Sequence, residues 1–252
     1  MHHLWNKLRL PSLAAVMAIL LGLVPNSHAT ERRFTASYET TTTPKGTWEI
    51  EQQFFWETGS GFDTFAFREE LEYGITDRLQ LGIYLFDWEH AREEGERSTK
   101  WEGSGIELVY QLTDPNKSFI GSALYGEVIV SDEKVKLEGK LLLQKNFGPL
   151  MVVYNAIIEA EWEDHYKEDV GVLEQTLGVS YQLNPSFSVG FEAKHEVALE
   201  HWEEAGDHAV FVGPNVSFRA GRFFGAFAGL FRVSDASGEP NFELNTIVGF
   251  HF

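Results

Sequence analysis

The chain has 252 residues, and its 38 Asp and Glu residues outnumber 20 Lys and Arg, which gives a formal net charge of −18. This acidity argues against a nucleic-acid partner, because few cations are present to neutralise phosphates. The sequence contains no Cys, which excludes disulfides, thiolate metal sites and cysteine catalysis.

The first predicted element is a targeting segment. Basic residues precede an apolar run over residues 10–24, and a small-residue cleavage signal, Ser27-His28-Ala29, follows it. This pattern predicts a secretory signal peptide over residues 1–29. A membrane anchor is the alternative, but the apolar run is too short to span a bilayer comfortably. The mature chain is therefore expected outside the cytoplasm.

Residues 30–46 are predicted to form an extended N-terminal arm. The segment 34–40 alternates like a strand, but a strand there would make the total odd and reverse the order of short and long connections. We therefore expect the arm at the periplasmic mouth of the fold or inside its lumen.

Apolar and polar residues alternate with period two over the rest of the chain, as is typical of β-strands. In the last segment, Phe242, Leu244 and Phe250 lie on one face, and Glu243 and Asn245 lie on the other. Twelve strands are predicted, at residues 47–57, 64–74, 78–89, 100–112, 118–131, 134–147, 150–162, 169–183, 187–200, 208–219, 222–233 and 240–252.

The connections between these strands alternate in length. Tight turns with Gly, Pro, Asn and Asp are predicted at residues 75–77, 113–117, 148–149, 184–186 and 220–221. Mostly longer, acidic loops are predicted at residues 59–63, 90–99, 131–133, 163–169, 201–208 and 234–241, of which only 131–133 is short. This alternation is typical of outer-membrane barrels. The sequence therefore predicts an all-β, 12-stranded antiparallel transmembrane β-barrel over residues 47–252.

The apolar face of such a barrel meets lipid and the polar face lines the lumen. Sixteen charged residues are predicted to line it: Glu49, Glu51, Arg68, Glu70, Glu72, Glu107, Lys136, Glu138, Lys140, Glu159, Glu174, Glu192, Lys194, Glu196, Arg219 and Glu243. Water or ion-pair networks must solvate them, because burying charges is costly. Twelve strands lie between a filled and an open barrel, so a narrow or partly occluded lumen is expected.

Three residues do not fit this alternation. Glu69 and Glu70 are adjacent, so one of them must face lipid, and His195 falls on the outward face near the middle of its strand. A bulge or a local change of phase would explain them.

No catalytic or cofactor motif is present, so neither an enzyme nor a bound cofactor or metal is expected. A metal site at His195, His201 and His208, beside an acidic loop, is a weaker alternative. A lipid-modifying barrel enzyme is another, with His195 paired to Ser180 or Ser217. The alternation of faces argues against either pair, because the two serines face inward and His195 faces outward.

The C-terminal strand ends with apolar residues at alternate positions, Val248, Phe250 and Phe252. This ending resembles the signal that the outer-membrane barrel assembly machinery reads. The expected partners are therefore this machinery, outer-membrane lipids and lipopolysaccharide.

Two stretches carry a family resemblance. The opening TPKGTWEIE at residues 43–51 and the hairpin EYGITDRLQLGIYL at residues 72–85 resemble the MetA-pathway phenol-degradation outer-membrane proteins. The resemblance implies a barrel channel or transporter. Both motifs encode turns and strands, so they transfer no binding residues.

Three functions are compatible with this sequence. The first is a narrow channel or transporter for small solutes, with an acidic lumen that favours cations. The second is a closed barrel with a structural or surface-interaction role and no transport. The third is the lipid-modifying enzyme.

Overall fold

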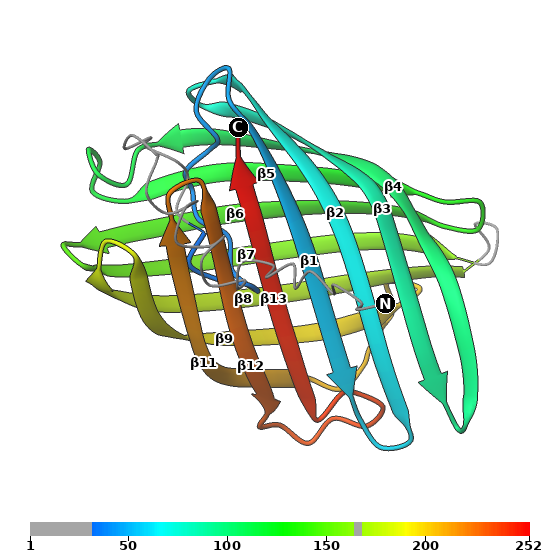
Figure 1. Cartoon of the computed structure of the whole chain (residues 1–252). Coiled ribbons are helices and arrows are strands. Elements are labelled where there is room, and N and C mark those ends of the chain that lie inside the picture. The colour runs from blue at the N-terminus through cyan, green and yellow to red at the C-terminus, as the bar shows by residue number, and fades with distance from the viewer. Residues whose placement is uncertain (1–31, 164–167) are drawn as a thin grey trace, which may run out of the picture.

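The computed structural model describes residues 32–163 and 168–252 (Figure 1), so the predicted signal peptide over residues 1–29 lies outside the described residues. Thirteen strands form in the described part of the chain: β1 (Trp48–Thr58), β2 (Phe62–Thr76), β3 (Leu79–Glu93), β4 (Glu96–Thr113), β5 (Gly121–Val130), β6 (Val135–Phe147), β7 (Leu150–Glu163), β8 (Glu168–Asn184), β9 (Phe187–Glu200), β10 (Glu204–Ala205), β11 (Ala209–Ala220), β12 (Phe223–Arg232) and β13 (Phe242–His251).

The strands form one closed antiparallel barrel. Each long strand pairs with the next long strand along the chain, and β13 pairs with β1 to close the barrel. The two-residue β10 only extends the edge of β9. The wall therefore has twelve strands, which confirms the predicted all-β, 12-stranded antiparallel fold. The described residues include no helix long and apolar enough to cross a membrane.

The barrel has two unlike ends. At one, the turn end, β2 joins β3, β6 joins β7, β8 joins β9 and β11 joins β12 through two residues each, and only β4 joins β5 through a longer connection, residues 114–120. At the other, the loop end, the connections over residues 201–208 and 233–241 are longer. The C-terminus lies at the turn end (Figure 1).

Side chains alternate between the two faces of the wall, as period two requires. On the outer face, Ile50 and Leu141 are 40% and 42% exposed. On the inner face, Glu51 and Glu243 are 1% and 2% exposed. The alternation therefore puts apolar side chains outside and carboxylates inside.

The predicted loop over residues 90–99 is wrong. Strands β3 and β4 continue through it as a hairpin, and only Glu94 and Gly95 form the turn. Both turn residues have positive φ, 49° and 92°, which is what a two-residue hairpin turn needs to match the twist of its strands. The acidic residues of this segment suit a loop, but a solvent-exposed hairpin tolerates them on both faces.

A β-bulge on β3 lies opposite the adjacent carboxylates Glu69 and Glu70 of β2. Glu69 pairs with Phe86 and Glu70 with Tyr84, so Leu85 is the extra residue on β3. Glu70 is buried on the inner face. Glu69 lies on the outer face directly opposite Gln52 of β1.

Candidate functional site

The inner face of the barrel is the candidate site, and all sixteen predicted lumen residues lie on it. Directly opposite residues of antiparallel strands share a face. Glu49, Glu72, Gly82, Glu107 and Glu127 are opposite one another from β1 to β5. The same row continues into β6 and β7 through Glu138 and Glu159. Each predicted residue is buried or half-buried, as a lumen position requires.

Carboxylates crowd together where β1 to β4 meet. Two groups of three each have a carboxylate oxygen within 4.8 Å of the others: Glu49 with Glu51 and Glu72, and Glu70 with Glu72 and Glu107. Gly82 leaves the space for the second group, because a Cβ there would lie 2.4 Å from Glu70 Oε1. The row of acids therefore depends on Gly82, the one position of β3 in this row, which has no side chain.

Lysines on β6 neutralise the next acids along the wall. Lys136 Nζ lies 3.5 Å from Glu127 and 3.1 Å from Glu159, and Lys140 Nζ lies 2.7 Å from Glu138. Lys140 also lies over the ring of Tyr125, 4.3 Å from its centroid. These contacts link β5, β6 and β7 by side chains as well as by the backbone ladder.

Two further ion pairs reach across intervening strands. Lys194 on β9 binds Glu243 on β13 at 2.7 Å, although β11 and β12 lie between them. Arg68 on β2 binds Asp87 at 2.6 Å and reaches within 4.0 Å of Glu127 on β5. Such pairs narrow the lumen, because they join side chains from separated parts of the wall.

The N-terminal arm lies inside the barrel, across its turn-end half (Figure 1). Amide side chains of the wall hold its backbone. Tyr38 N donates to Asn155 Oδ1 at 2.7 Å, Thr40 N to Gln144 Oε1 at 2.8 Å, and Thr43 N to Gln80 Oε1 at 2.8 Å. These acceptors belong to β7, β6 and β3, so the arm is bound to several strands of the wall and occupies the lumen at this end.

Glu192 of β9 binds the arm most extensively. Its side chain is 0% exposed. It accepts three consecutive backbone N–H groups, from Thr35 at 2.9 Å, Ala36 at 2.7 Å and Ser37 at 3.2 Å. Asn215 of β11 donates to the same carboxylate at 3.0 Å and to the carbonyl of Arg33 at 2.9 Å. One carboxylate thus accepts hydrogen bonds from the backbone N–H groups of three consecutive residues.

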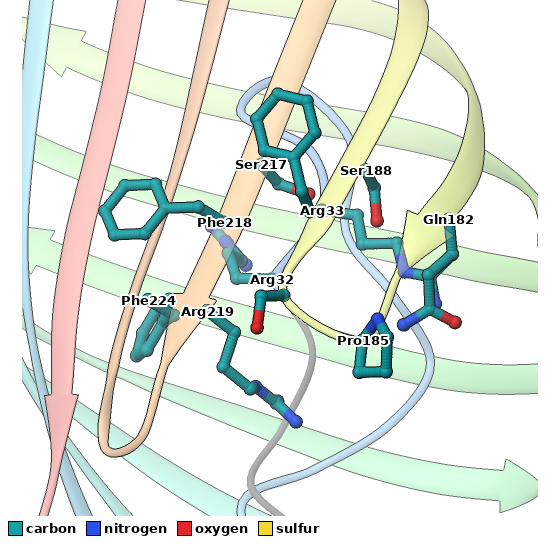
Figure 2. A pocket seen from close by; sticks show the side chains of 11 residues that line it. Arg32, Arg33, Gln182, Pro185, Ser188, Ser217, Phe218, Arg219 and Phe224 are labelled. Atoms are coloured by element: carbon teal, nitrogen blue, oxygen red, sulfur yellow. The ribbon is translucent and has the colours of Figure 1, made fainter. Parts of the chain in front are cut away.

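Little space remains between this part of the arm and the wall. Figure 2 shows Arg33 of the arm beside Gln182, Ser188 and Ser217 at the turn end, around a cavity of about 20 Å³. A larger cavity of about 660 Å³, bordered by Thr41 and Thr42 of the arm and by Lys145, also lies at the turn end. The arm therefore lines both cavities at this end of the barrel.

The root of the arm docks on Gly74. Gly46 N donates to Gly74 O at 2.8 Å, and a Cβ on Gly74 would lie 2.1 Å from Pro44 O. We expect Gly74→Ala to weaken docking by about 1–3 kcal/mol, the usual cost of overpacking. Limited proteolysis should then cleave the arm roughly tenfold faster. Gly126→Ala is the matched control, because nothing lies within 4 Å of its added Cβ; equal cleavage rates in both variants would contradict the expectation.

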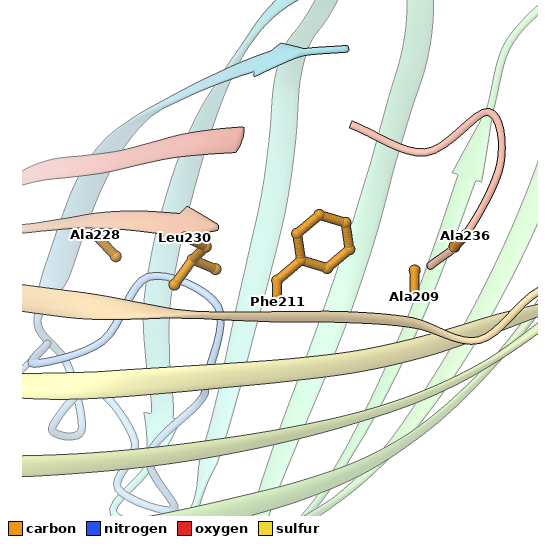
Figure 3. Close-up of a cluster of buried hydrophobic side chains, with 5 residues drawn as sticks. All are labelled: Ala209, Phe211, Ala228, Leu230 and Ala236. Carbon is orange, nitrogen blue, oxygen red and sulfur yellow. The ribbon is translucent and has the colours of Figure 1, made fainter. Parts of the chain in front are cut away.

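An apolar cluster narrows the lumen at the loop end. Phe211 and Leu230 are 0% exposed and pack with Ala236, which lies in the loop over residues 233–241 (Figure 3). Asp207 fixes this loop by accepting from Ser237 N at 3.0 Å. Ser237 Oγ donates to the same carboxylate at 2.9 Å, and these two hydrogen bonds hold the pKa of Asp207 below its usual range. The loop is thereby folded inward onto the wall.

The structure does not assemble the predicted Ser–His pairs. On β9, His195 lies five positions from the partner of Ser180 and seven from the partner of Ser217. His195 instead contacts His208, with 2.8 Å between ring nitrogens, while His201 binds Asp169. Only two of the three histidines predicted as a metal site therefore come together.

The apolar residues of the C-terminal signal lie on β13 or just after it. Val248 is opposite Gln52, and Phe250 is opposite Ile50, on the outer face. Phe252 N donates to Trp48 O at 2.9 Å. The end of the chain therefore forms part of the seam that closes the barrel.

Sequence reasoning missed the uncharged inner residues that bind the arm, namely Gln80, Gln111, Gln144, Asn155 and Asn215. The available signal was an amide side chain at an inward position near the turn end of its strand. These positions carry no charge, so the pattern of charged inward residues does not include them.

A closed barrel of outer-membrane type, with part of its N-terminal arm inside, is the class of protein that these features define. Residues 26–245 match DUF6662, a family of unknown function, and the chain belongs to this family. No curated protein matches the sequence. The resemblance to the MetA-pathway family stays a prediction.

Solved outer-membrane proteins share the fold. The COG4313 outer membrane channel from Pseudomonas putida F1 matches with a TM-score of 0.60 and 13% identity, over 85% of this chain and 98% of that chain. A NanC porin matches at 0.53 and 11%, over 81% and 98%. A KdgM porin in complex with disordered oligogalacturonate matches at 0.51 and 10%, over 81% and 98%. These low identities show a common fold alone.

Proposed function

We propose that this protein is an outer-membrane channel for small solutes that favours cations and is closed by its N-terminal arm. The observation that carries the proposal is a charged lumen in which the arm is held by side-chain hydrogen bonds and by one isolated bridge, Lys45 with Gly74, without becoming a strand of the wall. A plug bound in this way can leave without breaking the barrel.

The closed wall and apolar outer face of the barrel support a location in the outer membrane. An apolar outer face suits hydrocarbon, and a closed barrel leaves no unpaired strand edge in it. In barrels of this type, short turns face the periplasm and longer loops face outward. The turn end and the arm are thus periplasmic, the loop end is extracellular, and the terminal apolar residues serve recognition by the assembly machinery.

Selectivity follows from the lumen charges. The sixteen lumen residues comprise eleven Glu and five Lys or Arg, so cations are concentrated and anions repelled. The ion pairs across intervening strands and the inward-folded loop restrict the size of the solute. A transported solute is therefore small and neutral or cationic.

Planar-bilayer recording on the mature protein tests this function. We expect a small conductance whose reversal potential in a KCl gradient shows cation preference. The preference should weaken from 0.1 M to 1 M salt, because the Debye length falls from about 10 Å to about 3 Å. Anion preference, or no conductance both in the wild type and after the arm is released by substitution, would refute a cation channel.

A closed structural barrel is the second candidate. The plug and the Lys194–Glu243 bridge favour it, since both fill the lumen. It predicts a protein that shows the heat-modifiable gel mobility of a folded barrel but conducts no ions in any variant.

A further inference from the structure

The outer face carries an unassigned pocket near the loop end, with a volume of about 450 Å³. Its floor is a row of outward side chains that are opposite one another on five strands. The row consists of Leu244, Trp56, Phe65, His90 and Thr99. Trp56 and Phe65 are 39% and 42% exposed. The membrane-facing side of the barrel therefore holds a mostly apolar hollow with an aromatic floor.

A charged row borders this hollow on the side nearer the loop end. Arg92 is directly opposite Arg97 across the β3–β4 hairpin and opposite Asp63 on β2. All three residues line the pocket. Among the described residues, no carboxylate lies within ion-pairing distance of either arginine. Like charges directly opposite each other destabilise a sheet, so this arrangement gains stability when an anion lies between the two guanidinium groups.

The aromatic row and the arginine row are arranged to bind the apolar part and the charged head group of an amphiphilic molecule. The arginine row lies two residues beyond the aromatic row, about 7 Å along the strand. Apolar contacts lie toward the membrane centre, and paired guanidinium groups, which bind phosphate through forked hydrogen bonds, lie toward the surface. Acyl chains are the neighbours of this face, whereas a free anion would gain nothing from Trp56 and Phe65.

We propose that this pocket binds a phosphorylated acyl lipid of the outer leaflet, with its phosphate between Arg92 and Arg97 and its acyl part against Trp56 and Phe65. The proposal needs the barrel to lie in a membrane but does not need it to conduct ions. A closed barrel would bind the lipid equally well, so failure of the channel function leaves this inference intact.

Native mass spectrometry of the detergent-solubilised protein tests the proposal with lipid A as the probe. We expect one lipid A to bind the wild type, and affinity to fall about tenfold or more in the double variant Arg92→Ser/Arg97→Ser, which loses the charge-assisted hydrogen bonds. Arg78→Ser/Lys117→Ser is the matched control, since it removes two exposed cations at the turn end, and it should bind like the wild type.

Two further measurements separate the alternatives. Dephosphorylated lipid A should bind about tenfold more weakly to the wild type, with no additional loss in the Arg92→Ser/Arg97→Ser variant. Inorganic phosphate should not displace the lipid at millimolar concentration. Equal binding of both lipids, equal binding by the double variant and the wild type, displacement by phosphate alone, or a dimer that covers the pocket would overturn the proposal. Heat-modifiable mobility of each variant verifies that its barrel is folded.

Discussion

Replacing Glu192 by Ala is expected to release the arm and raise the open probability of the channel by roughly 100-fold. The variant removes the acceptor of three backbone N–H groups in residues 35–37. Buried donors left unsatisfied cost about 1–3 kcal/mol each, so the plugged state loses about 3 kcal/mol or more. Because 1.4 kcal/mol corresponds to a tenfold change, the population of the released state rises by about two orders of magnitude. Single-channel recording at fixed voltage measures it directly.

Two variants on neighbouring strands sharpen this experiment. Glu192→Gln keeps one acceptor oxygen and should give an intermediate open probability. Ser180→Ala is the matched control, because Ser180 is a buried inner residue of β8 whose hydroxyl has no hydrogen-bond partner. It should behave like the wild type. An unchanged open probability in Glu192→Ala, with the barrel folded, would show that the arm does not gate conduction.

The barrel can be predicted from local sequence because each strand has one face in contact with lipid and the other in contact with the polar lumen. Period-two alternation over segments such as residues 134–147 is a property of neighbouring residues, so it can be recognised before the partner strand is known. Closure then follows, because an open sheet edge is not tolerated in hydrocarbon. The parity that places Glu138 and Lys140 on one face also places them in the lumen, where the structure pairs them at 2.7 Å.

What the sequence did not predict depends on contacts between distant segments. The arm binds Asn155, which is 117 residues away from Tyr38, and no local pattern links the two. Glu72 and Glu107 come together because Gly82 lies between them in the register, and this register depends on the pairing of three strands. The hairpin at Glu94 and Gly95 was mistaken for a loop because its residues are acidic, although its turn residues suit a tight turn.

The arm also shows why charge alone is a poor guide to the site. Amide oxygens accept three of its backbone N–H groups, without the desolvation cost of a carboxylate. Glu192 accepts three more, and these backbone donors supply what a neighbouring cation would otherwise provide. A plug that relies on neutral acceptors leaves the lumen carboxylates available to cations once it has moved.

Replacing Lys194 by Met is expected to destabilise the barrel by about 3 kcal/mol, the usual cost of leaving a buried charge without its partner. Lys194 and Glu243 have side chains that are 13% and 2% exposed, so water replaces the lost ammonium poorly. Lys194 also contacts Glu196 at 3.1 Å, but that carboxylate is 22% exposed. The second substitution Glu243→Gln should restore most of the stability, because it removes the more buried of the two carboxylates that lose their partner. Denaturant unfolding in lipid vesicles, followed by tryptophan emission, measures both effects.

An exposed Lys–Asp pair serves as the comparison for the buried Lys194–Glu243 pair. Lys117 binds Asp114 at 2.8 Å at the turn end, but its side chain is 83% exposed. Hydrogen bonds from Lys117 and from Asn116 N hold the pKa of Asp114 below its usual range. Lys117→Met should nevertheless cost less than about 1 kcal/mol, as exposed pairs do.

The Lys194 variants also distinguish the two candidate functions. In a channel, losing the bridge across β11 and β12 widens the lumen and removes a positive charge, so Lys194→Met should increase both conductance and cation preference. The double variant Lys194→Met/Glu243→Gln should keep the larger conductance and return toward the original preference, because its net lumen charge equals that of the wild type. A closed structural barrel would show the stability changes alone, with no current in either variant.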